Sequence, residues 1–161
     1  MYNKERMHTN IKRINGFTLI ETLIGVTIIV VISTIVAMQV SSFAKKQKID
    51  NSVDESIALL NEARSRTLSA DGGNQYGVRV GSSSLELFTG STYSSASTNK
   101  IVTLPSGIAT VVSIAGGGTD VVFAQMTGDT NQYGTIVIKD STTTVGQKTI
   151  TLSKTGIASG N

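Results

Sequence analysis

One ionisable side chain, Glu21, lies inside a long apolar run that extends from Phe17 to Val40. A carboxylate near a membrane core costs about 2.5–3.5 kcal/mol even on the mildest insertion scale, so Glu21 is expected to have a cationic partner. Cleavage between Gly16 and Phe17 would create one, because the new α-amine of Phe17 would stand four residues before Glu21 on the same helix face. The positive end of the helix dipole would also favour ionised Glu21. These residues therefore indicate a charge pair in an apolar environment.

Other residue types that carry chemistry are few. The chain has no cysteine, and its one histidine, His8, precedes the apolar run, which excludes Cys-His and Ser-His-Asp catalysis and His- or Cys-based metal sites downstream. Asp120, Asp129 and Asp140 fall on separate predicted loops with no apolar pocket evident around them, so no acid–base pair can be assigned. We therefore predict that the protein is not an enzyme and uses no cofactor.

The segment from Asp129 to Asp140 has oxygen ligands near the spacing of a calcium loop, with a glycine sixth and an acid twelfth. Tyr133 stands where a fifth-position oxygen ligand is expected, and residues 135–139 are predicted to form a strand. An Asx-type turn is the interpretation that we favour over a metal site.

The apolar run contains no proline and is predicted to be helical. At about 1.5 Å per residue it would be roughly 36 Å long, enough to cross a bilayer with some tilt. Residues 1–16, before it, hold Lys4, Arg6, Lys12 and Arg13 against Glu5 alone.

The basic charge of the chain belongs to those first sixteen residues. Of Lys+Arg 14 and Asp+Glu 11 in the whole chain, subtracting these four bases and one acid leaves ten of each, so the remainder has a side-chain charge of about zero. The basic segment is expected to stay in the cytoplasm while the rest is translocated. Nucleic-acid binding loses its support from composition.

The stretch Gly16-Phe17-Thr18-Leu19-Ile20-Glu21, behind a short basic leader and ahead of a long apolar helix, resembles the type IV prepilin and pseudopilin signature. The resemblance implies a prepilin peptidase that cleaves after Gly16 and N-methylates Phe17. Glu21 would pair with the Phe17 amine of a neighbouring subunit in a filament. The implied partners are the peptidase, other pilin or pseudopilin subunits, an inner-membrane assembly platform and the lipid bilayer. The implied location is the cytoplasmic membrane, with a single pass and the β domain outside the cytoplasm, and then the pilus or pseudopilus.

Two alternatives stay open. The run could be a plain signal anchor, which would make the protein a single-pass, membrane-anchored binding domain that does not polymerise. Ser42-Phe43-Ala44 could be a conventional signal-peptidase site releasing a β-sandwich enzyme or adhesin, but the apolar run exceeds the usual 7–15 residues of such signals. The mature N-terminus would be Phe17 for a pilin, Met1 for an anchor and Lys45 for a secreted protein.

Beyond Val40 the sequence becomes amphipathic without a helix breaker, so one helix is predicted from Phe17 to about Ala70. Residues 71–74, Asp-Gly-Gly-Asn, are expected to end it because they tolerate positive φ. The apolar stripe of its second half is expected to cover a sheet, and its members are Phe43, Ile49, Val53, Ile57, Leu60 and Ala63.

Everything after residue 74 is predicted to form strands. The fold class is therefore α+β, a long N-terminal α-helix, transmembrane in its first half and amphipathic in its second, packed on a C-terminal antiparallel β-sheet or sandwich. The predicted domains are a basic leader (1–16), a transmembrane and assembly helix (17–40), an amphipathic helix (41–70) and a β-rich domain (71–161). The seven predicted strands are 76–80, 85–88, 101–104, 108–114, 121–125, 135–139 and 149–153.

The β region resembles, more narrowly, the minor pseudopilins typified by the H-type secretion pseudopilins and their minor-pilin relatives. DNA-binding members of that group carry arginines near the C-terminus, whereas the tail here has only Lys154, which argues against DNA binding. The resemblance lies in Leu104-Pro105-Ser106-Gly107-Ile108, Val122-Phe123, Thr127-Gly128 and Thr155-Gly156-Ile157.

Overall fold

The computed structural model describes residues 16–142 and 146–161, with the side chains of residues 36–41 left out. The chain divides into two compact units, Met1–Val40 and Ser41–Asn161, and helix α1 (Leu19–Leu68) contributes to both. Of the predicted leader, only Gly16 belongs to the described residues.

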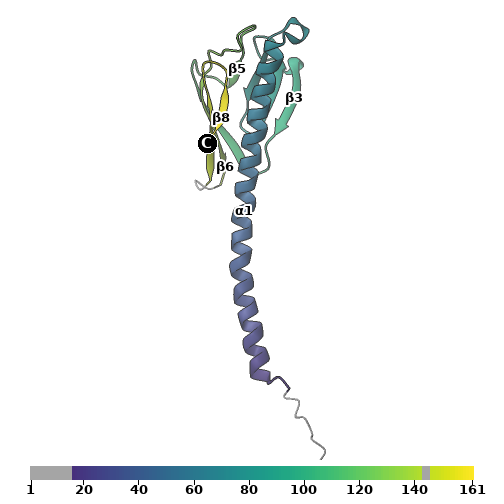
Figure 1. Cartoon of the computed structure of the whole chain (residues 1–161), viewed down its shortest axis with the longest axis vertical. Helices are drawn as coiled ribbons and strands as arrows, with labels where there is room; N and C mark the ends of the chain where they lie inside the picture. The colour runs from purple at the N-terminus through teal and green to yellow at the C-terminus, as the bar shows by residue number, and fades with distance from the viewer. Residues whose placement is uncertain (1–15, 143–145) are drawn as a thin grey trace, which may run out of the picture. The chain divides into compact units, whose positions relative to one another are not determined.

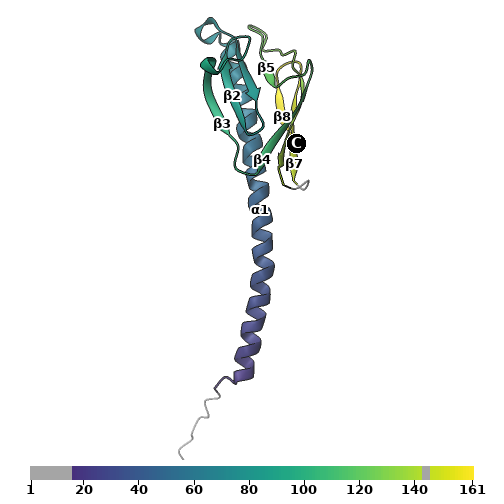
Figure 2. The ribbon, with the colours of Figure 1, turned by 180° about the vertical axis from the view of Figure 1, so that it is seen from behind.

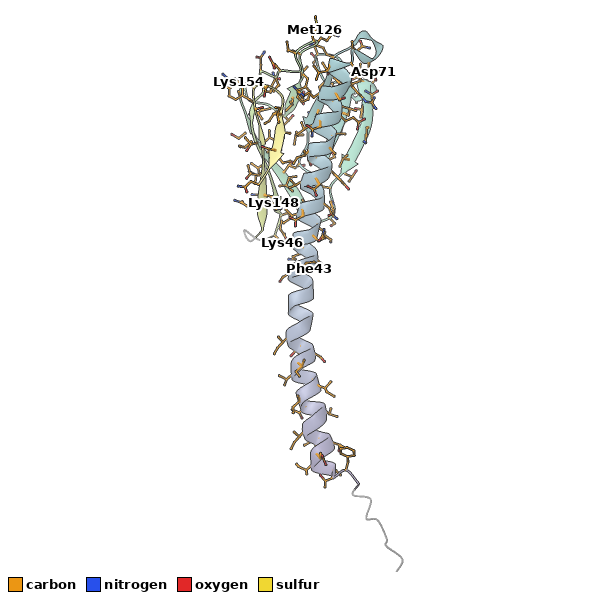
Figure 3. All side chains as sticks on the ribbon, in the orientation of Figure 1. Phe43, Lys46, Asp71, Met126, Lys148 and Lys154 are labelled. Atoms are coloured by element: carbon orange, nitrogen blue, oxygen red, sulfur yellow. The ribbon has the colours of Figure 1, made fainter. Side chains whose placement is uncertain are left out.

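In the first unit, α1 is apolar on every side. The large apolar side chains between Phe17 and Ile35 are between 52% and 82% exposed, and Figure 3 shows such side chains projecting from both sides of this stretch. A helix without a polar face needs an apolar cover of some kind. Within the part of the chain that the structure describes, no helix is sufficiently long and apolar to span a membrane.

In the second unit, α1 buries one face against the strands, and in Figures 1 and 2 the strands lie beside this half of the helix. The predicted stripe is confirmed at Ile49, Val53, Leu60 and Ala63, which are at most 4% exposed. It is wrong at Phe43, whose side chain is 69% exposed. The buried face also includes Leu59, Ser52, Ser56 and Thr67.

The buried hydroxyls on this face cost little because the helix itself accepts their hydrogen bonds. Ser56 Oγ donates to the Ser52 carbonyl at 2.7 Å, and Thr67 Oγ1 donates to the Ala63 carbonyl at 2.9 Å. The absence of a side chain at Gly160 lets its strand backbone approach this face closely, since an added Cβ would lie 2.9 Å from Ile57 and 3.0 Å from Val53.

The helix ends two residues before the predicted boundary. Ala70 takes the left-handed conformation (φ 51°, ψ 40°) that a C-terminal cap requires, although it is not a glycine. The predicted terminator, residues 71–74, instead forms the short 3-10 helix η1 (Asp71–Gly73) and its cap. Tyr76 then begins the first strand, and its N–H donates to Thr67 Oγ1 at 3.0 Å.

Two four-stranded antiparallel sheets complete the second unit, confirming the α+β class. The first has the order β3-β2-β1-β5 and the second the order β4-β6-β7-β8. The strands are β1 (Tyr76–Val80), β2 (Ser84–Thr89), β3 (Thr98–Thr103), β4 (Ile108–Ile114), β5 (Asp120–Val122), β6 (Gly134–Asp140), β7 (Gln147–Leu152) and β8 (Ala158–Gly160). A second short 3-10 helix, η2 (Ser95–Ser97), precedes β3.

One hydrophobic core joins α1 to both sheets. Val78, Leu87 and Val121 contribute from the first sheet and Ile136 and Ile150 from the second, all fully buried. Burying side chains of this size stabilises by about 1.5–3 kcal/mol each, so the sheets depend on the helix for much of their cover.

Arg64 on α1 explains two of the motifs that carried the narrower resemblance. Its Nε donates to the carbonyls of Gly128 and Thr155, both at 3.2 Å. A Cβ on Gly128 or Gly156 would lie 3.0 Å from this Nε, and one on Gly156 would also strike the Gly128 carbonyl. Both glycines have positive φ, so each is required by a turn and by close packing around the guanidinium.

Candidate functional site

Gly16 and Phe17 lie just before α1 and are exposed, with 82% of the Phe17 side chain accessible. A Cβ added to Gly16 would meet no atom within 4 Å. Nothing in the described fold therefore requires glycine at this position. A requirement for it would have to come from another molecule.

Thr18 caps the start of α1. Its Oγ1 accepts a hydrogen bond from the Glu21 N–H at 3.3 Å, and its carbonyl accepts from the Glu21 and Thr22 N–H groups at 3.1 and 3.2 Å. Thr-x-x-Glu is the sequence of a capping box, in which the glutamate would bond back to the N-cap N–H. Thr18 was not predicted as a site residue, although this four-residue pattern could have revealed it.

The Glu21 carboxylate makes no hydrogen bond or ion pair with any of the described residues, 16–142 and 146–161. It stands in the first turn of α1, where the unpaired N–H groups favour a negative charge. Of the two hydrogen bonds of a capping box, the one accepted by Thr18 is thus present, and the Glu21 carboxylate is left available to an external cation.

The polar side chains described between Thr22 and Thr34 form hydrogen bonds within the helix. A hydroxyl bonded to a carbonyl of its own helix carries no unpaired donor into an apolar environment. Glu21 is the one charged side chain among the described residues of this stretch. The hydroxyls of Thr22, Thr27, Ser33 and Thr34 donate to the carbonyls of Leu19, Leu23, Ile29 and Val31 at 2.7–2.9 Å.

Comparison with known families gives a match of residues 11–37 to the prokaryotic N-terminal methylation motif. This match covers Gly16, Phe17 and Glu21 together with the start of the apolar helix. The N-terminal segment of the chain thus carries the methylation motif of type IV pilins. In the proteins that carry it, this motif implies membrane anchoring followed by incorporation into a pilus.

The fold of this chain is similar to that of the type IV minor pilin FimU of Pseudomonas aeruginosa (strain PAO1), known from a crystal structure. The TM-score is 0.59 at 15% sequence identity, and the alignment covers 74% of this chain and 92% of FimU. Among curated protein sequences none matches the chain significantly. Membership of the H-type pseudopilin subgroup stays a prediction.

The three carboxylates considered for catalysis have different surroundings. Asp120 lies 3.9 Å from Arg79 Nε across the first sheet, whereas Asp129 is exposed on the loop before β6. No group of three or more His, Cys, Asp or Glu side chains that could hold a metal ion exists among the described residues. The strand predicted at 135–139 is confirmed as part of β6 (Gly134–Asp140), in the second half of the calcium-like spacing.

Asp140 has the most perturbed acidity in the second unit. Hydrogen bonds from the Thr142 hydroxyl (2.6 Å) and the Thr142 N–H (2.8 Å), with Lys45 Nζ at 3.4 Å, lower the pKa of Asp140 to about 2. The pKa of Glu62 is lowered first by its hydrogen bond from Lys100 (2.8 Å) and further by Arg66. Both acids join α1 to a sheet or its loop, or link neighbouring turns of α1, so their shifts fit a role in stability.

Proposed function

We propose that this pilin-like chain is a non-enzymatic filament subunit. A prepilin peptidase cleaves it after Gly16 and N-methylates Phe17. Before assembly the subunit resides in the cytoplasmic membrane as a single-pass protein, with its β domain outside the cytoplasm. An inner-membrane assembly platform adds it to other pilin or pseudopilin subunits in a type IV pilus or a type II secretion-type pseudopilus.

The observation that carries the proposal is the unpaired Glu21 carboxylate on an otherwise apolar helix, whose described hydroxyl groups donate hydrogen bonds to carbonyls of the same helix. Both lipid and a bundle of like helices would cover such a helix, and the apolar sequence continues past Ile35 through Val36, Ala37 and Met38. Little hydrophobic free energy separates these two states. The pairing of Glu21 with the Phe17 amine of a neighbour would therefore favour assembly.

The open surroundings of Gly16 support processing at this residue. Glycine is a costly choice where the fold does not use it, because it loses the most conformational entropy on ordering. A peptidase that draws an extended backbone past its catalytic groups would exclude a side chain at this position.

The test is the mature N-terminus in the native host. We expect Edman sequencing to begin at N-methylated Phe17, and Gly16→Val to leave full-length protein in the membrane. Gly25→Val is the matched control, since a Cβ on Gly25 also meets nothing within 4 Å, and it should be processed normally. Trimming of Gly16→Val to Phe17 would contradict the leader assignment.

The alternative is a single-pass, membrane-anchored binding domain that does not polymerise. It predicts an unprocessed N-terminus at Met1 and no dependence of any assembly on Glu21. The same sequencing experiment separates the two.

A further inference from the structure

One end of the Ser41–Asn161 unit is basic. Lys45, Lys46 and Lys48 follow one another on α1, and Lys148 lies near the start of β7; we call these four side chains the lysine patch. Figure 3 shows Phe43, Lys46 and Lys148 at the same end of this unit, far from Asp71 and Met126. The Phe43 side chain, which precedes the patch by two residues, is 69% exposed.

Three members of the lysine patch, Lys45, Lys46 and Lys148, line a pocket of about 390 Å³ between α1 and β7. Lys45 and Lys46 line it from the helix, and Gln147 and Lys148 line it from the strand. Ile49 adds apolar surface to the same pocket. Cationic groups thus converge on a concave surface that is partly apolar.

Half of the positive charge of the patch is not neutralised. Lys45 Nζ lies 3.4 Å from Asp140, and Lys148 Nζ lies 2.9 Å from Asp50, an acid that itself lines the pocket, so each of these two lysines is neutralised by a carboxylate. Lys46 and Lys48 form no ion pair with any described residue. The patch therefore keeps an excess of two positive charges, although the chain after residue 16 has equal numbers of bases and acids.

The position of the patch in the chain indicates its partner. Phe43 to Lys48 come directly after the apolar run that ends at Val40. An aromatic side chain followed by lysines is the arrangement found where a membrane helix reaches the headgroup layer, because lysine stems remain in apolar surroundings while the ammonium groups meet phosphate. A purely protein partner would not explain why apolar and cationic groups adjoin at this one place.

We propose that the lysine patch binds anionic phospholipid headgroups while the subunit waits in the membrane. The proposal rests on the membrane-anchored state proposed above. Headgroup phosphates would occupy the pocket beside Lys46, while Phe43 enters the interface. Each lysine near an anionic bilayer contributes about fivefold to binding, and the effect falls away over a Debye length, about 8–10 Å at physiological salt.

The test uses the full-length chain in nanodiscs whose phosphatidylglycerol content is raised at the expense of phosphatidylcholine. The measurement is amide hydrogen exchange of the peptide containing Gly146 to Lys148, which lines the pocket without belonging to the apolar helix. We expect slower exchange as phosphatidylglycerol increases. Lys46→Gln should lower the apparent binding constant fitted to this titration about fivefold, and Lys46→Gln with Lys48→Gln about 25-fold.

Lys154→Gln is the matched control, because this lysine also lacks a carboxylate partner among the described residues but lies at the opposite end of the unit. It should leave the titration unchanged. Exchange that is equal in both lipids, or that slows only when a second pilin-like chain is present, would overturn the proposal and leave membrane anchoring intact. Failure of the chain to enter nanodiscs would overturn both.

Discussion

Single residues in unusual conformations or environments give the sharpest stability tests. Ala70 has the left-handed conformation that ends α1, with φ 51° and ψ 40°. This conformation costs an L-residue about 1–2 kcal/mol, whereas glycine adopts it without steric strain. A glycine at this position is expected to improve the end of the helix.

Ala70→Gly is accordingly expected to stabilise the protein by about 0.5–1 kcal/mol, measured as a shift of the urea midpoint. Ala58→Gly is the matched control, since Ala58 is exposed inside α1, where glycine costs about 1 kcal/mol. Two variants with the same chemical change should thus shift stability in opposite directions. Equal destabilisation by both would show that Ala70 does not take the left-handed conformation that ends α1.

Asp140 makes the free energy of unfolding depend on pH in the acid range. Its pKa of about 2 in the folded protein is below its ordinary value of 3.8, so the stability that it contributes is complete above pH 4. It is lost as the pH falls toward 2. Asp140→Asn should be less stable than the parent at pH 7, and the difference between their urea midpoints should close between pH 4 and pH 2.

The control for this pH dependence is Asp129→Asn, because Asp129 is exposed and its carboxylate makes no ion pair within the described residues. Its urea midpoint should follow that of the parent across the range. A difference between Asp140→Asn and the parent that stays constant down to pH 2 would mean that the Thr142 and Lys45 contacts do not hold the carboxylate in solution.

At the scale of elements, the helical stripe is the part of α1 that belongs to the hydrophobic core shared with both sheets. Leu60 is fully buried, whereas Phe43, on the same predicted stripe, is exposed. Leu60→Ala should cost about 2–5 kcal/mol and lower the midpoint of the cooperative melt strongly. Phe43→Ala removes a larger side chain and should change stability by no more than about 0.5 kcal/mol.

Periodic elements could be predicted from the sequence, whereas elements defined by distant contacts could not. The helix and seven of the eight strands were predicted because apolar residues recur at regular steps along them. β8 was missed because Ala158-Ser159-Gly160 has neither alternation nor β-branched side chains, and its place is set by pairing with β7. The division into two sheets was also hidden, since nothing local in β4 and β5 specifies their partners.

The candidate site could be predicted from the sequence because its residues adjoin along the chain and do not depend on distant contacts. Gly16, Phe17 and Glu21 lie within six residues, so their spacing needs no fold to be recognised. The sequence reveals only part of the lysine patch. Lys45, Lys46 and Lys48 are close together in the sequence, whereas Lys148 is brought to the same pocket by the fold. The error at Phe43 has a similar origin: a stripe extrapolated along a helix does not reveal where the sheets stop covering it.

At the scale of the whole molecule, the proposed assembly needs an interface that repeats without closing. A heterologous contact, in which one face of a subunit meets a different face of the next, generates a helical filament unless its rotation closes a ring. The Phe17 amine and the Glu21 carboxylate are two such different surfaces. Because they lie on one chain, every added subunit would present a new carboxylate to its successor.

Glu21→Leu separates a filament subunit from a simple anchor. Removing the charge makes membrane insertion easier by at most about 2.5–3.5 kcal/mol, so the variant should insert at least as well as the parent. Assembly should nevertheless fail, because the Phe17 amine of the incoming subunit would remain unpaired in an apolar bundle at a cost of several kcal/mol. The measurement is recovery of the subunit in sheared filaments, or cross-linked to other pilins, at equal amounts of the variant and the parent in the membrane.

Thr27→Leu is the control, because it removes a polar group from the same helix but no charge, and it should assemble normally. Equal recovery of Glu21→Leu and the parent would leave the anchored binding domain as the better account, because an anchor has no use for the lost charge.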